Sequence, residues 1–408
     1  MQEQKRQIVY SILMGLLCGL VLVMSFVAGF LAHEWMNQSA PISAISTDVN
    51  QAGFPLLDEV KAYVERVYLK EQPNYIQQQY AAIRGYLAAL EDPYTFFIEP
   101  PVAANEADAL AGVYGGIGVQ IRRNEKGEMV LYPYPDSPVL KNDIREGAIL
   151  IAIDGIELDL SLSNDDIDRQ LRGEVKEGSG VEITVLQDEE EKTVFIEFGL
   201  IEVPSVLYHL DEDNPTLGYI QIIRFTSRTP DELEAAVSAL LDEGVEALIL
   251  DLRNNSGGLL LESVEVASVF LDDQVVTYEQ SRDKETPLYA SKGGLAIDIP
   301  LVVLVNGRTA SASELVAGAI RDNDRGIVIG QTTYGKGTVQ QIYPISDGSS
   351  VHITSAEWFT PDHTPINGVG LVPNIAMIPA EDGRDVEYGE AVRYLLEILN
   401  QEGSLENE

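Results

Sequence analysis

Cysteine and histidine are both scarce in this chain of 408 residues, and their scarcity excludes several kinds of site. Cys18 is the one cysteine, so the chain can form neither an internal disulfide nor a cysteine-rich metal site. The four histidines lie at His33, His209, His352 and His363, and none has a companion at metal-ligand spacing. We therefore expect no metal and no organic cofactor.

Basic residues are also few. The chain has 27 lysines and arginines against 65 aspartates and glutamates, which gives a formal charge of −38. Such a surface repels the phosphates of nucleic acid, and the sequence contains no basic block. No calcium-binding loop of alternating acidic residues is present either. We interpret the acidic excess as a means of solubility outside the cytoplasm.

Charge is absent altogether from residues 8–32. A helix of that length rises about 37 Å, enough to cross a hydrocarbon core of about 30 Å. Lys5 and Arg6 precede it, which predicts an N-terminus inside the cell and the rest of the chain outside. A cleaved signal peptide is the alternative, because Ala28 and Ala32 are small. The length of the segment favours an uncleaved single-pass anchor in the cell membrane.

Composition and periodicity predict an α/β multidomain protein with six segments. The segments are a cytoplasmic tip and transmembrane anchor (1–36), a linker (37–54), a helical N-terminal region (55–103), a β-rich domain (104–199), an α/β core (200–382) and a C-terminal helix with an acidic tail (383–408).

The β-rich domain is predicted from short β-branched runs separated by glycine turns, with one helix at 164–171 capped by Ser163 or Asn164. A glycine-rich segment stands directly before its first strand. Backbone N–H groups in such a turn can hold an anion, and an exposed strand edge can accept a peptide. The candidate peptide-binding residues are Tyr114, Gly115, Gly116, Ile117, Gly118 and Val119.

After Pro204 the chain alternates apolar strands with amphipathic helices. Strands are expected at 218–223, 247–252 and 300–305, and helices at 229–243 and 259–271. Continuous apolar strands between helices are typical of a sheet that is covered on both faces and contains parallel pairs.

Two serines, Ser311 and Ser313, lie where the last of these strands gives way to a further helix. Unpaired N–H groups at a helix N-terminus suit a nucleophile whose intermediate carries an oxyanion. The alternative is simple capping, with Glu314 in the first turn. Residues 311 and 313 are therefore equal candidates on local grounds.

A serine nucleophile needs a base, and Lys336 is a candidate because glycines flank it on both sides. Free lysine has a pKa near 10.4, and burial without an acidic partner lowers that value. A surface lysine in a turn is the alternative. Catalysis with His209, His352 or His363 is a second alternative that no motif supports. Ser281 and Lys284 fit an S-x-x-K pattern, but its partner motifs are absent.

The segments Thr309-Ala-Ser-Ala-Ser-Glu-Leu315 and Gly335-Lys-Gly-Thr-Val-Gln340 resemble the signature of the carboxyl-terminal processing peptidases, also called tail-specific proteases. In that family the lysine follows the serine by 25 residues, which selects Ser311 with Lys336. The resemblance implies that Gln340 orients the lysine amine. Through the Asp251–Gly258 stretch, it also implies that the amides of Gly257 and Ala312 form the oxyanion hole.

The resemblance extends from about residue 56 to 375, with Ser256 in place of a common proline and Asn374 in place of a common aspartate. It implies a PDZ domain at 104–199 that binds apolar substrate C-termini and either delivers them or gates the site. The expected partners are protein or peptide substrates and the lipid bilayer. The oligomeric state is left open, a homo-oligomer included. A catalytically silent PDZ scaffold at the membrane is the rival interpretation.

Overall fold

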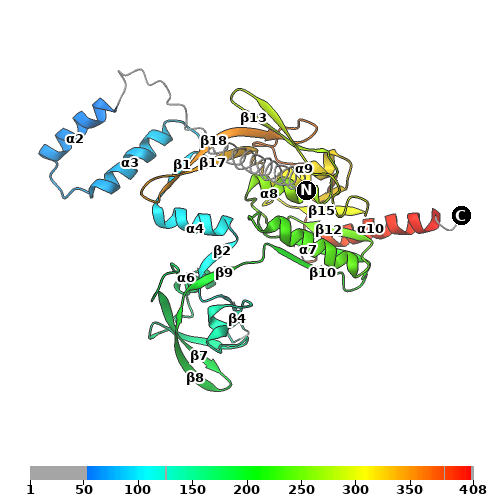
Figure 1. The fold of residues 1–408 in the computed structure, drawn as a ribbon, viewed down its shortest axis with the longest axis horizontal. Coiled ribbons are helices and arrows are strands. Elements are labelled where there is room, and N and C mark those ends of the chain that lie inside the picture. Colours follow the sequence, from blue (N-terminus) through cyan, green and yellow to red (C-terminus); the bar gives the residue numbers. More distant parts are fainter. Residues whose placement is uncertain (1–52, 125, 381, 406–408) are drawn as a thin grey trace, which may run out of the picture. The chain divides into compact units, whose positions relative to one another are not determined.

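The computed structural model describes residues 53–405, except 125 and 381 (Figure 1). The predicted anchor at 8–32 lies outside these residues, as does Cys18. Among the described residues, no helix combines the length and the apolar character needed to cross a bilayer. The chain divides into two compact units, residues 1–75 and 76–408.

The helical region predicted at 55–103 contains two helices before the first strand. α2 (Pro55–Val67) is amphipathic, begins with proline at its first position, and has no buried residue. α3 (Tyr75–Ala88) follows and buries Tyr80 and Leu87. The region predicted to be helical thus contains two separate helices before β1 (Phe96–Ile98).

A third helix, α4 (Pro100–Leu110), runs across residue 104, from which the sequence predicted short strands with one helix at 164–171. Proline at its start and an alanine-rich body favour a helix there. α4 leads into β2 (Val113–Gly116), which pairs with β9 (Gly199–Glu202). The whole β-rich region lies between these two strands.

That region has a sheet and an apolar core of its own. The sheet order is β3 (Val119–Arg123), β4 (Met129–Pro133), β5 (Ile149–Ile153), β7 (Gly180–Gln187) and β8 (Glu190–Glu197), with β6 (Ile156–Glu157) paired to β5. Two short helices, α5 (Pro138–Lys141) and α6 (Asn164–Gln170), complete it. Ser163 Oγ accepts the Asp166 N–H (3.1 Å), which confirms the predicted cap of α6.

The second half of the chain is built on a six-stranded sheet. Its order is β10 (Val206–Leu210), β11 (Leu217–Ile222), β12 (Ala247–Asp251), β15 (Leu301–Val305), β16 (Ile327–Gly330) and β19 (Ile375–Ala376). β10 is antiparallel to β11, and all the other neighbours are parallel. The three predicted apolar strands are its centre, which confirms the α/β prediction.

Helices cover both faces of this sheet because its side chains alternate. Leu248 and Leu250 of β12 pack with α7 (Thr229–Asp242), α8 (Leu260–Ser268) and α9 (Ala312–Asp322). Ala247 and Ile249 of the same strand pack with α10 (Val386–Leu405) on the other face. The carboxyl ends of the parallel strands remain open for a site.

A second, antiparallel sheet has no counterpart in the predictions. It consists of β1 (Phe96–Ile98), β18 (Ser350–Phe359), β13 (Val275–Ser281) and β14 (Glu285–Tyr289), with β17 (Thr338–Pro344) also paired to β18.

Asn374 bonds to β16 of the parallel sheet, since its Oδ1 accepts the Val328 N–H at 2.8 Å. An amide at 374 thus supplies an acceptor like that of the expected aspartate.

Candidate active site

Ser311 lies after the carboxyl end of β15 and is the residue that precedes α9. Its backbone has φ 56° and ψ −120°, a conformation that costs a non-glycine residue energy and that is common at functional sites. Ser313 is fully buried, and its Oγ donates to the Asn255 carbonyl oxygen (3.1 Å). Of the two candidate serines, only Ser311 lines the cavity described below.

A buried carboxylate, Glu314, joins the Ser311 turn to the Lys336 loop. One oxygen, Oε2, accepts the N–H groups of Ser311 (2.7 Å) and Lys336 (2.9 Å). The other, Oε1, accepts the Gly335 N–H (2.7 Å) and the Thr333 hydroxyl. Glu314 therefore fixes the backbones of both candidate catalytic residues at once. The sequence placed it only as a helix cap.

Lys336 lies in the loop between β16 and β17, and its side chain is partly buried. Its Nζ donates to Gln340 Oε1 (3.0 Å), while Gln340 Nε2 donates to the Tyr94 carbonyl oxygen (2.5 Å). Burial lowers the pKa of the Lys336 amine, and the negative charge of Glu106 opposes this by raising it. The fall prevails, so this amine loses its proton more readily than free lysine.

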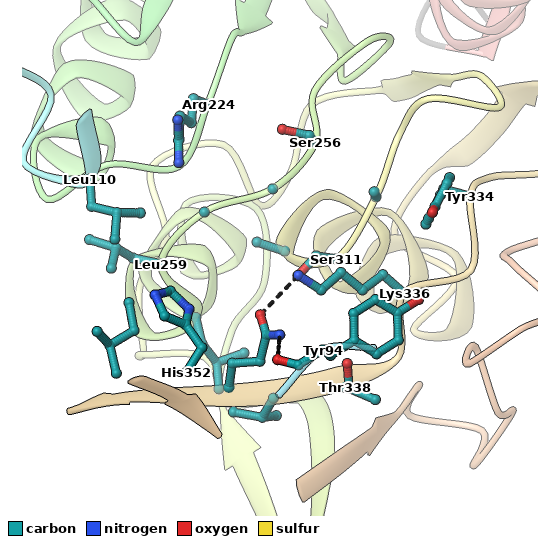
Figure 2. Close-up of a pocket in the computed structure, with 18 of the residues that line it drawn as sticks. Tyr94, Leu110, Arg224, Ser256, Leu259, Ser311, Tyr334, Lys336, Thr338 and His352 are labelled. Carbon is teal, nitrogen blue, oxygen red and sulfur yellow. Dashed lines mark hydrogen bonds between the residues drawn. The ribbon is translucent and has the colours of Figure 1, made fainter. Parts of the chain in front are cut away.

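A cavity of about 630 Å³ holds Ser311, Lys336 and Gln340 on its walls. Figure 2 shows the Lys336 chain extending toward Ser311, with the amine beside it. No hydrogen bond joins Ser311 Oγ to Lys336 Nζ among the contacts of the described residues. Such bonds often tighten only when substrate binds. The cavity brings together a hydroxyl, an amine of lowered pKa and an amide that orients this amine.

The glycine turn at Gly257 lies against the start of α9. A Cβ built on Gly257 would approach the Ala312 nitrogen to 3.1 Å and Ser311 Cβ to 2.8 Å, so the turn packs directly on the Ser311 backbone. The Gly257 N–H itself donates to Asn255 Oδ1 (2.9 Å). In this structure an oxyanion would have to share that donor or displace Asn255.

Local sequence patterns did not place two other residues, His352 and Glu106, at the cavity. His352 lines the cavity, and its ring stacks on that of Phe96 with 4.5 Å between the ring centroids. Its Nε2 lies 2.9 Å from Glu106 Oε2. Glu106 is carried by α4, and neither residue stands in a recognisable motif. The other two described histidines lie elsewhere, with His209 stacked on Tyr219 and His363 on Tyr278.

The glycine segment of the β-rich region forms a narrower turn than predicted. Tyr114, Gly115 and Gly116 belong to β2, so only Ile117 and Gly118 stand between strands. Gly118 has φ +79°, which suits glycine. The Ile117 N–H is taken by the Leu171 carbonyl oxygen, and the Ile117 side chain is buried. Val119 opens β3, whose outer edge is unpaired within its sheet.

The described residues include no group of three or more histidine, aspartate or glutamate side chains suited to a metal ion.

Known proteins resemble this chain over most of its length. Peptidase family S41 matches residues 216–377. A carboxyl-terminal-processing protease of Picosynechococcus sp. is 34% identical over 323 residues, which cover 78% of this chain and 77% of that protein. One of the same name from Synechocystis sp. is 32% identical over 339 residues, covering 80% and 79%. The chain belongs to the carboxyl-terminal-processing protease family.

Members of this family are serine-type peptidases, so the chain is a serine-type peptidase and a hydrolase. The family prediction and the enzyme class are thereby confirmed. Among solved structures, a photosystem II D1 C-terminal processing protease is 31% identical, with a TM-score of 0.47, and the match covers 79% of this chain and 89% of that one.

Proposed function

We propose that this carboxyl-terminal-processing protease cleaves protein substrates at or near their C-termini, with Ser311 as nucleophile and Lys336 as general base. The observation that supports it best is that Ser311 shares its cavity with a lysine whose pKa burial has lowered. A neutral amine can accept the hydroxyl proton as bonding to the carbonyl carbon begins.

In this mechanism, Ser311 Oγ attacks the scissile carbonyl carbon while Lys336 Nζ takes the hydroxyl proton. The carbon–nitrogen bond then breaks, and the Lys336 ammonium gives that proton to the leaving amine. Water attacks the acyl carbon and loses a proton to Lys336. The bond from that carbon to Ser311 Oγ then breaks, and the Lys336 ammonium returns the proton to Ser311 Oγ. Gln340 Oε1 accepts one N–H of the amine and so directs the lone pair. The N–H groups of Gly257 and Ala312 are our candidates for binding the oxyanion.

We further propose that residues 104–199 are a PDZ domain that binds the substrate's C-terminus. The free edge of β3 and its neighbour α6 form the kind of surface to which an extended peptide adds as a strand. The glycine segment from Tyr114 to Val119 precedes this edge. Titration of the full chain with peptides ending in apolar residues tests this role, since a C-terminal amide should bind far less tightly than a carboxylate.

We propose that residues 8–32 are the anchor that holds the enzyme in the cell membrane, with its catalytic part outside the cytoplasm. Detergent, and not high salt, should release the full chain from a membrane pellet, and removal of residues 1–36 should leave it in the supernatant. Release of the full chain by salt alone would contradict this.

The catalytic assignment is tested by casein cleavage. Ser311→Ala and Lys336→Ala should each abolish cleavage while circular dichroism stays that of the wild type, because each removes one half of the proton transfer. His352→Gln should retain most activity. Cleavage at the wild-type rate by either dyad variant, or a collapse in His352→Gln, would favour a histidine base or another nucleophile instead.

A further inference from the structure

Arg224 stands beside the glycine turn of the active site. It follows β11 and precedes Phe225, whose N–H donates to the Gly257 carbonyl oxygen (3.1 Å) and whose own carbonyl accepts the Leu259 N–H (3.0 Å). These bonds fix the backbone of Arg224 to the turn that packs on Ser311. Its side chain lines the same cavity.

The guanidinium of Arg224 has no partner among the described residues, and its Nε is fully buried. The contrast with other arginines of this domain is clear. Arg228 pairs with Glu202 and Glu232, and Arg253 pairs with Asp251 and Asp385. A buried donor without an acceptor costs free energy, and a guanidinium offers five donors and no acceptor. A buried donor of this kind in a catalytic cavity is available to an acceptor group of a ligand.

The charge of the cavity points to an anion. Among the described residues, two arginines that stay charged line it, Arg224 and Arg308, against Glu106 as its one anionic side chain. Lys336 adds a third cation only when its amine is protonated. This local excess of positive charge contrasts with the net charge of the whole chain, which is −38. A cleft with one sign of charge concentrates ligands of the other sign. Figure 2 shows Arg224 across the cavity from Lys336, near Leu110 and Leu259.

We propose that Arg224 binds a carboxylate of the substrate on the side of the cavity away from Lys336. Arginine matches a carboxylate through two parallel hydrogen bonds, which fix orientation as well as charge. The carboxylate can come from the chain end or from an acidic side chain near the scissile bond. The proposal rests on Ser311 as the nucleophile, because that residue defines where the scissile bond lies.

The test uses the full-length enzyme and a short internally quenched peptide in three forms. In the first form all side chains are neutral and the C-terminus is a free carboxylate. The second form has the same sequence with a C-terminal amide. The third form is a series of these amides in which one glutamate is placed at successive positions of the peptide. Arg224→Met should lower kcat/KM by about 10- to 100-fold for each carboxylate form that wild type prefers. It should leave the neutral amide within about threefold of wild type. The peptide form whose kcat/KM falls most in Arg224→Met, relative to wild type, identifies the source of the carboxylate.

Two further variants keep the result interpretable. Arg224→Lys retains the charge and should recover part of the loss, while Arg282→Met, which changes an exposed loop arginine, should behave as wild type. Equal losses for neutral and carboxylate peptides, or no loss for either, would refute the proposal. Failure of the Ser311 assignment would appear differently, as cleavage that persists in Ser311→Ala whatever the peptide carries.

Discussion

Replacing Glu314 with glutamine tests whether one buried carboxylate holds both halves of the proposed dyad. The carboxylate accepts four donors, two at each oxygen, from Ser311, Thr333, Gly335 and Lys336. Glutamine has nearly the same shape but only one acceptor oxygen. With its NH₂ group in the place of Oε2, the amide faces two backbone N–H groups that have lost their acceptor. With its NH₂ group in the place of Oε1, it deprives the Gly335 N–H, while the Thr333 hydroxyl can turn and accept.

The magnitude follows from these lost contacts. Each buried donor left unsatisfied costs about 1–3 kcal/mol, so the loss of one or two in Glu314→Gln should lower the free energy of unfolding by about 1–6 kcal/mol. Domain stabilities are about 5–15 kcal/mol, so a folded but weakened enzyme is expected. The backbones of Ser311 and Lys336 would also lose their common anchor. A displacement of about 1 Å costs about 100-fold in rate.

Urea unfolding followed by circular dichroism gives the free energy, and peptide hydrolysis at a temperature where the variant is folded gives kcat/KM. Glu234→Gln, an exposed position on α7, controls for the loss of one charge and should change neither. A Glu314→Gln enzyme within about 1 kcal/mol of wild type and within about twofold in kcat/KM would refute the reasoning.

Two other predictions concern the same cavity. Glu106→Gln removes the negative charge that raises the pKa of Lys336, so that pKa should fall further. Since the neutral amine is the active form, the acid limb of kcat/KM against pH should move to lower pH, and a limb that stays or rises would contradict this. Gly257→Ala would put a methyl group 2.8 Å from Ser311 Cβ at φ +99°, and should reduce kcat/KM by about 100-fold or more. Gly244→Ala, with a similar positive φ but open space around it, is the matched control and should retain activity.

Some of the site was readable from the sequence because its signals are local. The apolar runs at 247–252 and 300–305 predicted the buried strands β12 and β15, and the Ser-Ala-Ser-Glu segment predicted a helix start. The spacing of 25 residues then selected Ser311 over Ser313 through the family resemblance. The structure adds an independent reason for Ser311, because Ser313 is buried and its hydroxyl donates to the Asn255 carbonyl oxygen.

Other parts could not be predicted from local patterns. The second sheet was missed because β18 pairs with β1 and β13, which lie far from it in the chain. In addition, β17 and β18 carry exposed and buried side chains in irregular order. Helix α4 was missed because its alanines and acidic residues show no clear apolar stripe. Since α4 carries Glu106, missing it also hid the charge that acts on Lys336.

The sequence by itself determined the three central strands of the larger sheet, the helix start at Ser311, the family and the identity of the dyad candidates. These depend on neighbours in the chain or on a fixed spacing. Only the tertiary structure decided what surrounds the dyad: Glu314 bonded to both loops, Gln340 held by the Tyr94 carbonyl, and Arg224 left without a partner. Burial and hydrogen bonding between distant segments set these properties, and the folded chain alone brings such segments together.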